Sequence, residues 1–459
     1  MTEVILEAAD GSVTPVHALE AGALAGFLEA GPSFLKAYAA LHEFKAKTGQ
    51  ILVVPNAQGA ADQVLFGLGD APTAQAFRAL PAKLPPGDYQ IAAAPEGLVR
   101  ADIALAFALG SYKFDRYKSH GAARPRLIEA SCDLTAPRQI AKACAMARDM
   151  INTPANDFGP LQIETLCREV AEQHGAKISV ITGNALLEEN YPAVHAVGRA
   201  AAPDRAPRMI ELTWGKAKHP LVAVVGKGVT FDTGGLDIKP SAGMRQMKKD
   251  MGGAAHALAL GRMIMAAELP VRLVVLIPAV ENAISADAMR PGDVLASRKG
   301  LSIEVGNTDA EGRLILADAL TRACELEPAL TLDLATLTGA ARVALGPQLP
   351  PFYTDDEDLA AQISLAMNQV DDPMWRMPLW KGYADSLDSD VADIKNDPDA
   401  WAQAGSVTAA LFLQRFAPKG PWAHFDIFAW NPRSRPGWPA GAEAQAIRAL
   451  FQMISSRFA

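Results

Sequence analysis

The sequence predicts an α/β protein with two domains. Continuous apolar runs of strand length alternate with longer segments whose apolar residues recur at helical spacing, a pattern typical of a sheet covered by helices on both faces. The chain has 459 residues, which is too long for one ordinary domain of roughly 100–200 residues. We expect an N-terminal α/β domain over residues 1–130, a connecting helix over 131–150 and a C-terminal α/β domain over 151–459.

In the N-terminal part, short apolar runs predict buried strands and longer apolar segments between Pro and Gly predict helices. The predicted strands cover 51–55 and 64–69, and the predicted helices cover 75–84 and 98–114. No cluster of titratable residues stands out in this part, so it carries little information about chemistry.

The C-terminal part predicts helices and strands in alternation after a loop at 151–160 that is rich in Pro and Asn. A hairpin is expected at Lys299-Gly300. The predicted helices cover 161–175, 252–269 and 442–454, and the predicted strands cover 177–182, 220–226, 271–280 and 329–335.

Composition excludes several classes of protein. A net charge of −8 argues against a protein whose main task is to hold nucleic acid. The acidic N-terminal stretch is unlike a signal peptide, and no apolar run is long enough to predict a membrane helix. The four cysteines form no C-x-x-C pair, so reduced thiols in a cytoplasm are expected.

The stretch NTDAEGRLILADAL at 307–320 has two interpretations. Thr308 and Glu311 fit a capping box at the start of a helix, with Asp309 suited to the positive end of the helix dipole. Alternatively, Asp309, Glu311 and Arg313 belong to a site completed by residues elsewhere in the chain.

A second polar stretch, at 224–253, follows the predicted strand 220–226, where ligands of α/β sheets gather. It contains no G-x-x-x-x-G-K-[ST] loop, and the chain has no H-E-x-x-H. His256 lies on an apolar helix face, where a core histidine is expected. Oxygen ligands for divalent cations are therefore favoured. Four carboxylates would suit two cations if the fold brought them together: Asp232, Asp250, Asp309 and Glu311. The common alternative is that these carboxylates are scattered over the surface.

Three motifs together resemble the leucyl aminopeptidase (cytosol aminopeptidase) family of dinuclear metallopeptidases. They are GKGVTFDTGGLDIKP at 226–240, MKKDMGGAA at 247–255 and NTDAEGRLILADAL at 307–320. The resemblance implies a macro-domain-like N-terminal domain, a catalytic domain with a mixed sheet flanked by helices, and a cytoplasmic homohexamer. It also implies a metal-dependent aminopeptidase that acts on peptides with a free N-terminus. The composition, and not the resemblance, argues against a membrane partner and against nucleic acid.

The resemblance further implies two divalent ions per subunit, Zn²⁺, Mn²⁺ or Mg²⁺. Asp232 and Glu311 would bridge both ions, Asp309 would complete one site, and Lys227 and Asp250 would complete the other. Lys227 would have to bind as the neutral amine, although the ordinary pKa of lysine is about 10.4. Adjacent cations would lower that pKa because they penalise the ammonium form.

Two further residues match the family's catalytic positions. Lys239 would stabilise the tetrahedral oxyanion formed when a metal-activated water attacks the peptide carbonyl. Arg313 would anchor a bicarbonate that acts as general base, since a guanidinium fork suits planar oxyanions. Asp237, Lys248 and Lys249 are interpreted as solvated surface residues.

The pocket for the N-terminal side chain matches the family at four positions and departs from it at a fifth. Met247, Thr336 and Gly339 match pocket-lining positions, and Leu337 matches a position whose backbone contacts substrate. Phe428 stands where the family usually has Ala, so the pocket is expected to be narrower or reshaped, and a preference for leucine does not follow.

Two alternatives to the aminopeptidase remain open. One is a DNA-binding, structural or regulatory member of the family with a secondary peptidase role or none. The other is a metal-dependent hydrolase of a different amide, which the Phe428 departure keeps open.

Overall fold

The computed structural model describes residues 4–118, 121, 123–398 and 403–459. The chain divides into two compact units. One comprises Met1–Ala145 with Pro432–Ala440, and the other comprises Met146–Asn431 with Gly441–Ala459. The segment Pro432–Ala440 therefore belongs with the N-terminal unit, although it is distant from that unit in sequence.

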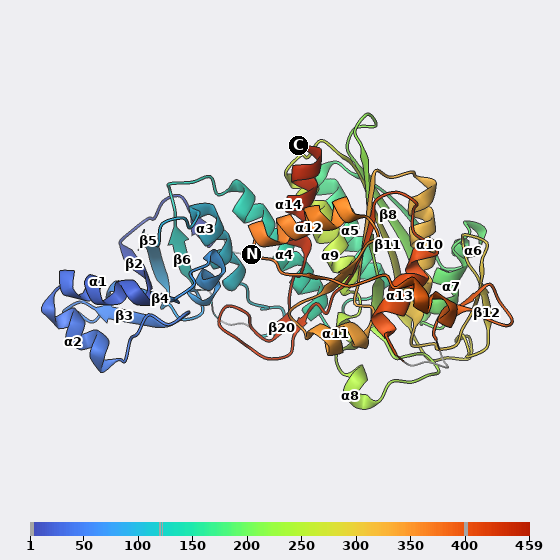
Figure 1. Cartoon of the computed structure of the whole chain (residues 1–459), viewed down its shortest axis with the longest axis horizontal. Coiled ribbons are helices and arrows are strands. Elements are labelled where there is room, and N and C mark those ends of the chain that lie inside the picture. The colour runs from blue at the N-terminus through green and yellow to red at the C-terminus, as the bar shows by residue number, and fades with distance from the viewer. Residues whose placement is uncertain (1–3, 119–120, 122, 399–402) are drawn as a thin grey trace. The chain divides into compact units, whose positions relative to one another are not determined.

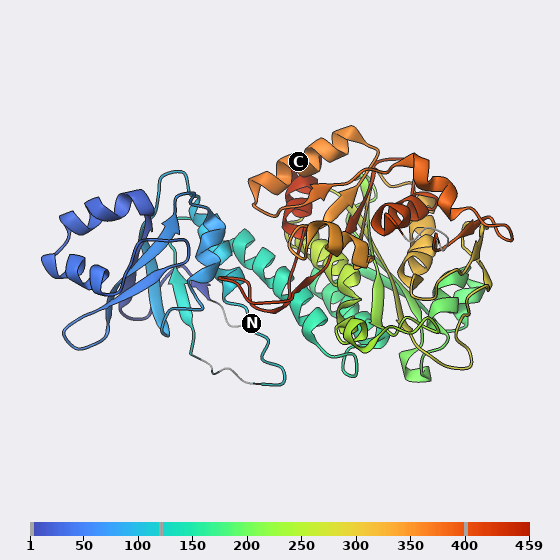
Figure 2. The same cartoon turned by 60° about the horizontal axis from the view of Figure 1, so that its bottom comes forward.

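The first unit is built on a six-stranded sheet (Figure 1). Its strand order is β1-β6-β5-β2-β4-β3, with β3 antiparallel to β4 and the other neighbours parallel. Helices α1 and α2, in dark blue, pack against each other beside this sheet (Figure 2). The bounds are β1 Ile5–Leu6, β2 Val13–Glu20, β3 Ile51–Pro55, β4 Ala61–Gly69, β5 Gly87–Ala93, β6 Pro125–Ile128, α1 Leu24–Ala30, α2 Ser33–Leu41 and α3 Arg100–Gly110.

The predicted strands of this unit are present at 51–55 and within β4. Of the two predicted helices, the second is α3, whereas the first is a 3₁₀ helix, η2, over Ala74–Ala79. Pro81 explains the short first helix, because a proline in the interior would remove a hydrogen bond of the α-helical ladder. The helix α4 then runs over Thr135–Asn152.

The second unit is built on a nine-stranded mixed sheet. Its main path is β16-β15-β18-β14-β9-β11-β8-β7, and β10 pairs with β11. The bounds are β7 Lys177–Thr182, β8 Arg208–Trp214, β9 Leu221–Gly226, β10 Gly228–Asp232, β11 Arg272–Asn282, β14 Leu330–Ala335, β15 Pro351–Tyr353, β16 Trp375–Arg376 and β18 Trp422–Asp426. Five strands of this sheet run parallel to one another: β9, β10, β11, β14 and β18.

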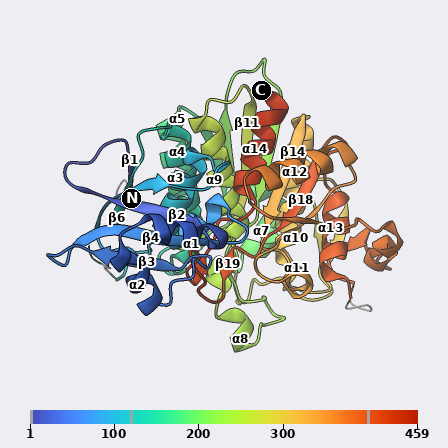
Figure 3. The same cartoon turned by 60° about the vertical axis from the view of Figure 1, so that its left-hand side comes forward.

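Helices cover both faces of this sheet (Figure 1). Helix α9 packs on β9, β11 and β14, and α14 packs on α9 and α12 (Figure 3). On the other face, α10 packs against β9 and β11 and contacts α7 and α13. The bounds are α5 Pro160–His174, α6 Ala185–Glu188, α7 Pro192–Gly198, α8 Ser241–Met244, α9 Gly252–Ala266, α10 Glu311–Glu325, α11 Gly339–Leu345, α12 Glu357–Gln369, α13 Gly405–Gln414 and α14 Ile447–Phe458.

Smaller elements complete the second unit. The predicted hairpin at Lys299-Gly300 is confirmed, since β12 and β13 pair antiparallel around it and Gly300 has a φ of +87°. The remaining strand bounds are β12 Val294–Ala296, β13 Ser302–Glu304, β17 Ile394–Lys395, β19 Trp430–Asn431 and β20 Gly441–Ala442. The 3₁₀ helices of this unit are η3 Pro203–Arg205, η4 Met247–Lys249 and η5 Lys381–Leu387, whereas η1 Ala21–Ala23 belongs to the first unit. None of the helices in the described part of the chain combines the length and the apolar composition needed to cross a membrane.

The central strands are apolar along their whole length because they are covered on both faces. Every residue of β9 and of β14 is buried, as is nearly all of α10. A core cluster joins side chains of α7, α10 and α13 to those of β9 and β11. The carboxyl ends of the parallel strands are thereby held on a rigid base, which positions the loops that follow them.

Candidate active site

Three polar residues and one apolar residue lie where four parallel strands end. Lys227 follows β9, Asp232 is the last residue of β10, Thr336 follows β14, and Ile427 follows β18. Each of these residues lines one cavity of about 660 Å³ in the second unit. In open α/β sheets this edge is where ligands bind, as the sequence predicted for the stretch 224–253.

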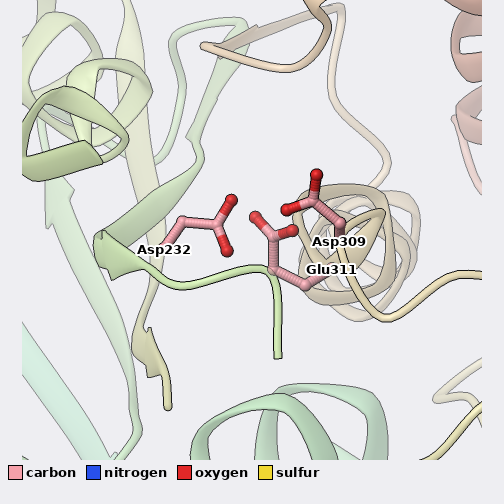
Figure 4. Close-up of side chains that lie close together, drawn as sticks. All are labelled: Asp232, Asp309 and Glu311. Atoms are coloured by element: carbon pink, nitrogen blue, oxygen red, sulfur yellow. The ribbon is translucent and has the colours of Figure 1, made fainter. Parts of the chain in front are cut away.

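Three carboxylates meet at this edge. Asp232 comes from the end of β10, Asp309 comes from the loop before α10, and Glu311 is the first residue of α10. Their carboxylates point toward one another (Figure 4). One oxygen from each lies within 4.8 Å of the others. Asp250, from the loop before α9, joins the group through Lys227, whose Nζ lies 2.7 Å from Asp250 Oδ2 and 3.0 Å from Glu311 Oε1.

Two lysines provide the positive charge among these carboxylates. Lys227 is buried, and its Nζ also donates to the carbonyl oxygen of Thr336 at 3.1 Å. Lys239 Nζ lies 2.8 Å from Asp232 Oδ2 and also pairs with Asp309. Burial opposes the charge of both lysines, but the surrounding carboxylates prevail and raise the pKa of each above its ordinary value.

The carboxylates are crowded, and their pKa values reflect it. Burial, followed by repulsion from Asp232, raises the pKa of Glu311 to about 8 and that of Asp309 to about 6. Burial works in the same direction at Asp250, but Lys227 and Lys249 hold its pKa below the ordinary value. Like charges this close are stable only when protons or cations compensate them.

Several oxygens of the cluster are open to a further partner. Asp250 Oδ2, Asp309 Oδ1 and Glu311 Oε1 are buried, and among the described residues none receives a well-directed hydrogen bond, although each faces a lysine. Buried polar atoms are normally satisfied, so each such oxygen requires an explanation. Divalent cations explain all three, because hard cations prefer carboxylate oxygens.

Local contacts fix the orientation of Asp232. Its Oδ1 accepts hydrogen bonds from Asn282 Nδ2 at 2.8 Å and from the amide of Gly234 at 2.9 Å. Gly234 has a φ of +88°, and a Cβ there would lie 3.0 Å from Asp309 Oδ1. The Asp-Thr-Gly-Gly turn after β10 therefore needs glycine both for its backbone conformation and for the space beside Asp309.

The capping box predicted for Thr308 and Glu311 is wrong. Helix α10 begins at Glu311, its N-cap residue is Ala310, and no side chain caps it. The hydroxyl of Thr308 instead donates to the carbonyl oxygen of Gly234 at 2.6 Å and accepts from the amide of Asp237 at 2.9 Å. Thr308 thus joins the loop before α10 to the loop after β10 and sets the distance between their carboxylates.

Arg313 lies on the first turns of α10 and lines the same cavity. It is buried, and its Nη1 donates to the carbonyl oxygen of Asn396 at 2.6 Å. Its Nε has no hydrogen-bond partner among the described residues. Burial lowers the pKa of the Arg313 guanidinium. A buried guanidinium with an open donor at a cavity wall is suited to a small anion.

The structure brings the predicted residues together. The cavity is lined by all of the predicted site residues except Glu311, whose carboxylate adjoins it in the cluster: Lys227, Asp232, Lys239, Met247, Asp250, Asp309, Arg313, Thr336, Leu337, Gly339 and Phe428. A volume of this size suits a small ligand or a few residues of a peptide.

Sequence reasoning missed several residues that line this cavity, and two of them are cationic. Lys249, interpreted as a solvated surface residue, is only 6% exposed and lines the wall. That interpretation was wrong because a lysine in a polar loop is normally exposed, and only the packing of Phe428 over it shows otherwise. Burial lowers the pKa of Lys249 to about 8. Arg342, on α11, also lines the cavity and was not singled out.

A third residue supports the site from behind. Asp426, the last residue of β18, accepts hydrogen bonds from the amides of Leu337 at 3.0 Å and Thr338 at 3.1 Å. It therefore orients the loop after β14, which lines the cavity. The signal available in the sequence was its position in the mostly apolar segment WAHFDI, for which no strand was predicted.

His256 is a core histidine, as predicted. It is fully buried on α9, its Nδ1 donates to the carbonyl oxygen of Gly252 at 2.6 Å, and its Nε2 accepts from the amide of Gln445 at 2.9 Å. These partners require the neutral ring. Burial lowers the pKa of His256 to about 4.

The fold and the site together define a metal-dependent hydrolase, because clustered carboxylates with open oxygens border a substrate-sized cavity. Comparison with protein families gives a match to the cytosol aminopeptidase family, catalytic domain, over residues 145–451, and to the M17 aminopeptidase N-terminal domain over residues 14–129. The chain belongs to the cytosol aminopeptidase family.

Individual relatives agree with the family. A probable cytosol aminopeptidase of Syntrophotalea carbinolica is 40% identical over 365 residues, which cover 75% of this chain and 73% of the relative. The crystal structure of the cytosol aminopeptidase of Coxiella burnetii has a TM-score of 0.93 and 42% identity, covering 99% of this chain and all of that one. The bottromycin maturation enzyme BotP in complex with Mn has a TM-score of 0.88 and 33% identity, covering 98% of this chain and all of that one.

These matches confirm the resemblance stated from the sequence motifs and the two-domain α/β fold. The protein is a metal-dependent aminopeptidase, a metalloexopeptidase of a family that uses a dinuclear metal centre. The non-enzymatic and DNA-binding alternatives are not favoured.

Proposed function

We propose that Lys227, Asp232, Asp250, Asp309 and Glu311 hold two divalent cations, Mn²⁺, Zn²⁺ or Mg²⁺. The observation that carries this proposal is the meeting of three carboxylate oxygens within 4.8 Å, with open oxygens on Asp250, Asp309 and Glu311. The ammonium groups of Lys227 and Lys239 now balance that negative charge. The Mn complex of BotP is a property of that relative that agrees with the proposal.

Lys227 has the contacts expected of a metal ligand whose ammonium group loses a proton when the cation binds. It is buried between Asp250 and Glu311, so a cation bound there would take over the charge that its ammonium now supplies. When bound, the cations would act as Lewis acids and lower the pKa of a water nucleophile. The ligand residues on β10 and α10 hold their geometry because both elements are fixed to the core.

The chain's own residues then provide three functions around the reacting carbonyl. Lys239, which lines the cavity beside Asp232 and Asp309, would donate to the developing oxyanion. Arg313 would hold a bicarbonate through its open Nε, and that anion would supply a general base beside the attacking water. Leu337 offers its backbone to the substrate, oriented by the hydrogen bond to Asp426.

The substrates are peptides with a free N-terminus. We assign Met247, Thr336, Gly339 and Phe428 to the pocket for the N-terminal side chain, because all four line the cavity that borders the carboxylates. A cytoplasmic location and a homohexamer are part of the same proposal and rest on membership of the family.

Metal removal tests the proposal. We expect chelation followed by dialysis to abolish hydrolysis of leucine amide, and Mn²⁺ or Zn²⁺ to restore it. Glu311→Gln should lose bound metal, measured by elemental analysis, and lower kcat by at least about a hundredfold. Glu325→Gln is a matched control on the same helix, since Glu325 is a partly exposed partner of Arg298 outside the cavity. Full activity in protein shown to be metal-free would overturn the proposal.

A further inference from the structure

The cavity has a positively charged wall that the proposed mechanism does not use. Lys249 ends the short helix η4, beside Asp250, and its Nζ lies 4.7 Å from the centre of the Phe428 ring. The guanidinium carbon of Arg342 lies 5.5 Å from the same ring centre. Both cations line the cavity, so Phe428 is associated with two positive charges on the wall assigned to the N-terminal side chain.

Lys249 forms no ion pair or side-chain hydrogen bond with the described residues, although two carboxylates lie near it. Asp250 is assigned to the metal site through Oδ2, which Lys227 Nζ now faces at 2.7 Å, and its Oδ1 accepts from the hydroxyl of Thr336 at 2.9 Å. Asp426 is occupied by the hydroxyls of Thr338 and Ser406, at 2.6 and 2.9 Å, and by two backbone amides. A charged lysine whose residue is only 6% exposed is costly without an anionic partner, and a cation–π contact offsets only part of that cost.

Arg342 adds a second positive charge near Phe428, from a position that is more exposed to solvent than that of Lys249. Its side chain is exposed on α11, and no ion pair or side-chain hydrogen bond holds it among the described residues. The other cations of the cavity differ from these two: Lys227 and Lys239 are paired with carboxylates, and Arg313 donates to Asn396. The positive charge to which the proposed mechanism assigns no anion therefore lies around Phe428.

We propose that Lys249 selects peptides whose N-terminal residue is acidic, Asp or Glu. The inference rests on the proposed assignment of this wall to the N-terminal side chain. A substrate carboxylate would provide the partner that Lys249 lacks, in a site where water is partly excluded and an ion pair is correspondingly strong. Phe428 favours the same substrates because it fills space that a larger side chain would need. A cationic N-terminal residue would be repelled by Lys249 and Arg342.

The test compares aminoacyl substrates on the full chain loaded with Mn²⁺. Glutamyl and glutaminyl p-nitroanilides have side chains of nearly equal size that differ in charge, so their ratio of kcat/KM isolates the effect of the carboxylate. We expect the glutamyl substrate to be preferred by at least tenfold. Lys249→Met, which keeps the length of the side chain, should reduce the ratio to about one, whereas Lys249→Arg should keep a preference for the acid. A general loss of activity would not move this ratio.

Lys248→Met is the matched control. Its Nζ donates to the carbonyl oxygen of Asn152 at 2.6 Å and lies 5.7 Å from the Trp430 ring centre, and it does not line the cavity. The ratio should be unchanged in this variant. A wild-type ratio of one or below would overturn the inference even if Lys249→Met did not fold, as would a ratio that survives in a folded Lys249→Met. Activity on leucyl but not glutamyl substrates would refute only this inference, whereas no activity on either with metal present would refute the proposed function.

Discussion

Gly312→Ala separates the stability of the helix from the function of the site. Gly312 is the second residue of α10 and is buried against Lys227. A Cβ at this position would lie 2.5 Å from Lys227 Cε and 2.6 Å from Nζ. Ordinary contacts between such atoms are about 3.5 Å or longer, so the lysine side chain would have to move by about 1 Å.

That displacement acts on the metal site and not on the backbone. Lys227 Nζ is held 2.7 Å from Asp250 and 3.0 Å from Glu311, and a shift of about 1 Å would break or distort both contacts. Misplacing a catalytic group by this amount costs on the order of a hundredfold in rate. Alanine is at the same time the better helix former, by about 1 kcal/mol, which offsets part of the lost ion pairing. We expect kcat/KM to fall about a hundredfold while the urea midpoint changes little.

The assay measures three quantities on the same preparation: kcat/KM for leucine amide, bound metal after dialysis against a fixed concentration of Mn²⁺, and the urea midpoint. Gly26→Ala provides the control, because Gly26 lies within α1 and its added Cβ would meet no atom within 4 Å. If Gly312→Ala keeps its metal and its rate within threefold of the wild type, Lys227 does not need its observed position, and its assignment as a ligand fails.

Two further predictions concern the core and the base. Because burial holds the pKa of His256 at about 4, against 6.5 in the unfolded chain, the unfolded state binds the extra proton first as the pH falls. The contribution of the neutral His256 ring to the free energy of unfolding is therefore fully present above pH 6.5. It is reduced by about 2 kcal/mol at pH 5 and is lost as the pH falls through about 4. The difference in unfolding free energy between wild type and His256→Gln should therefore shrink by about 2 kcal/mol from pH 7 to pH 5, and a constant difference would contradict the neutral buried ring. Arg313→Met should lower kcat by about a hundredfold with little change in KM and should remove any dependence of the rate on added bicarbonate; a variant that still responds to bicarbonate would show that the anion binds elsewhere.

The amino-acid sequence by itself determined the strands of the sheet and the residues at their ends. The apolar run 220–226 predicted β9, and the polar stretch after it supplied Lys227 and Asp232. The strand and the loop after it can be read locally, because a strand buried on both faces needs a continuous run of apolar residues. The loop beyond the strand has no such requirement and can carry polar residues. The motif at 307–320 likewise placed Glu311 at the start of a helix, whereas Asp309 lies in the loop before it.

Only the tertiary structure decided what those residues contact. The sequence favoured a cap for α10 at Thr308, but the side chain bonds to Gly234, which is distant in the chain. Lys249 has the local pattern of a solvated lysine and is buried because Phe428, from beyond the last strand of the sheet, covers it. A residue's partners come from whichever elements the fold brings beside it, so local propensity cannot specify them. The same reason explains why the open oxygens of Asp250, Asp309 and Glu311, which identify the site physically, were visible only once β10, α10 and the loop before α9 were assembled.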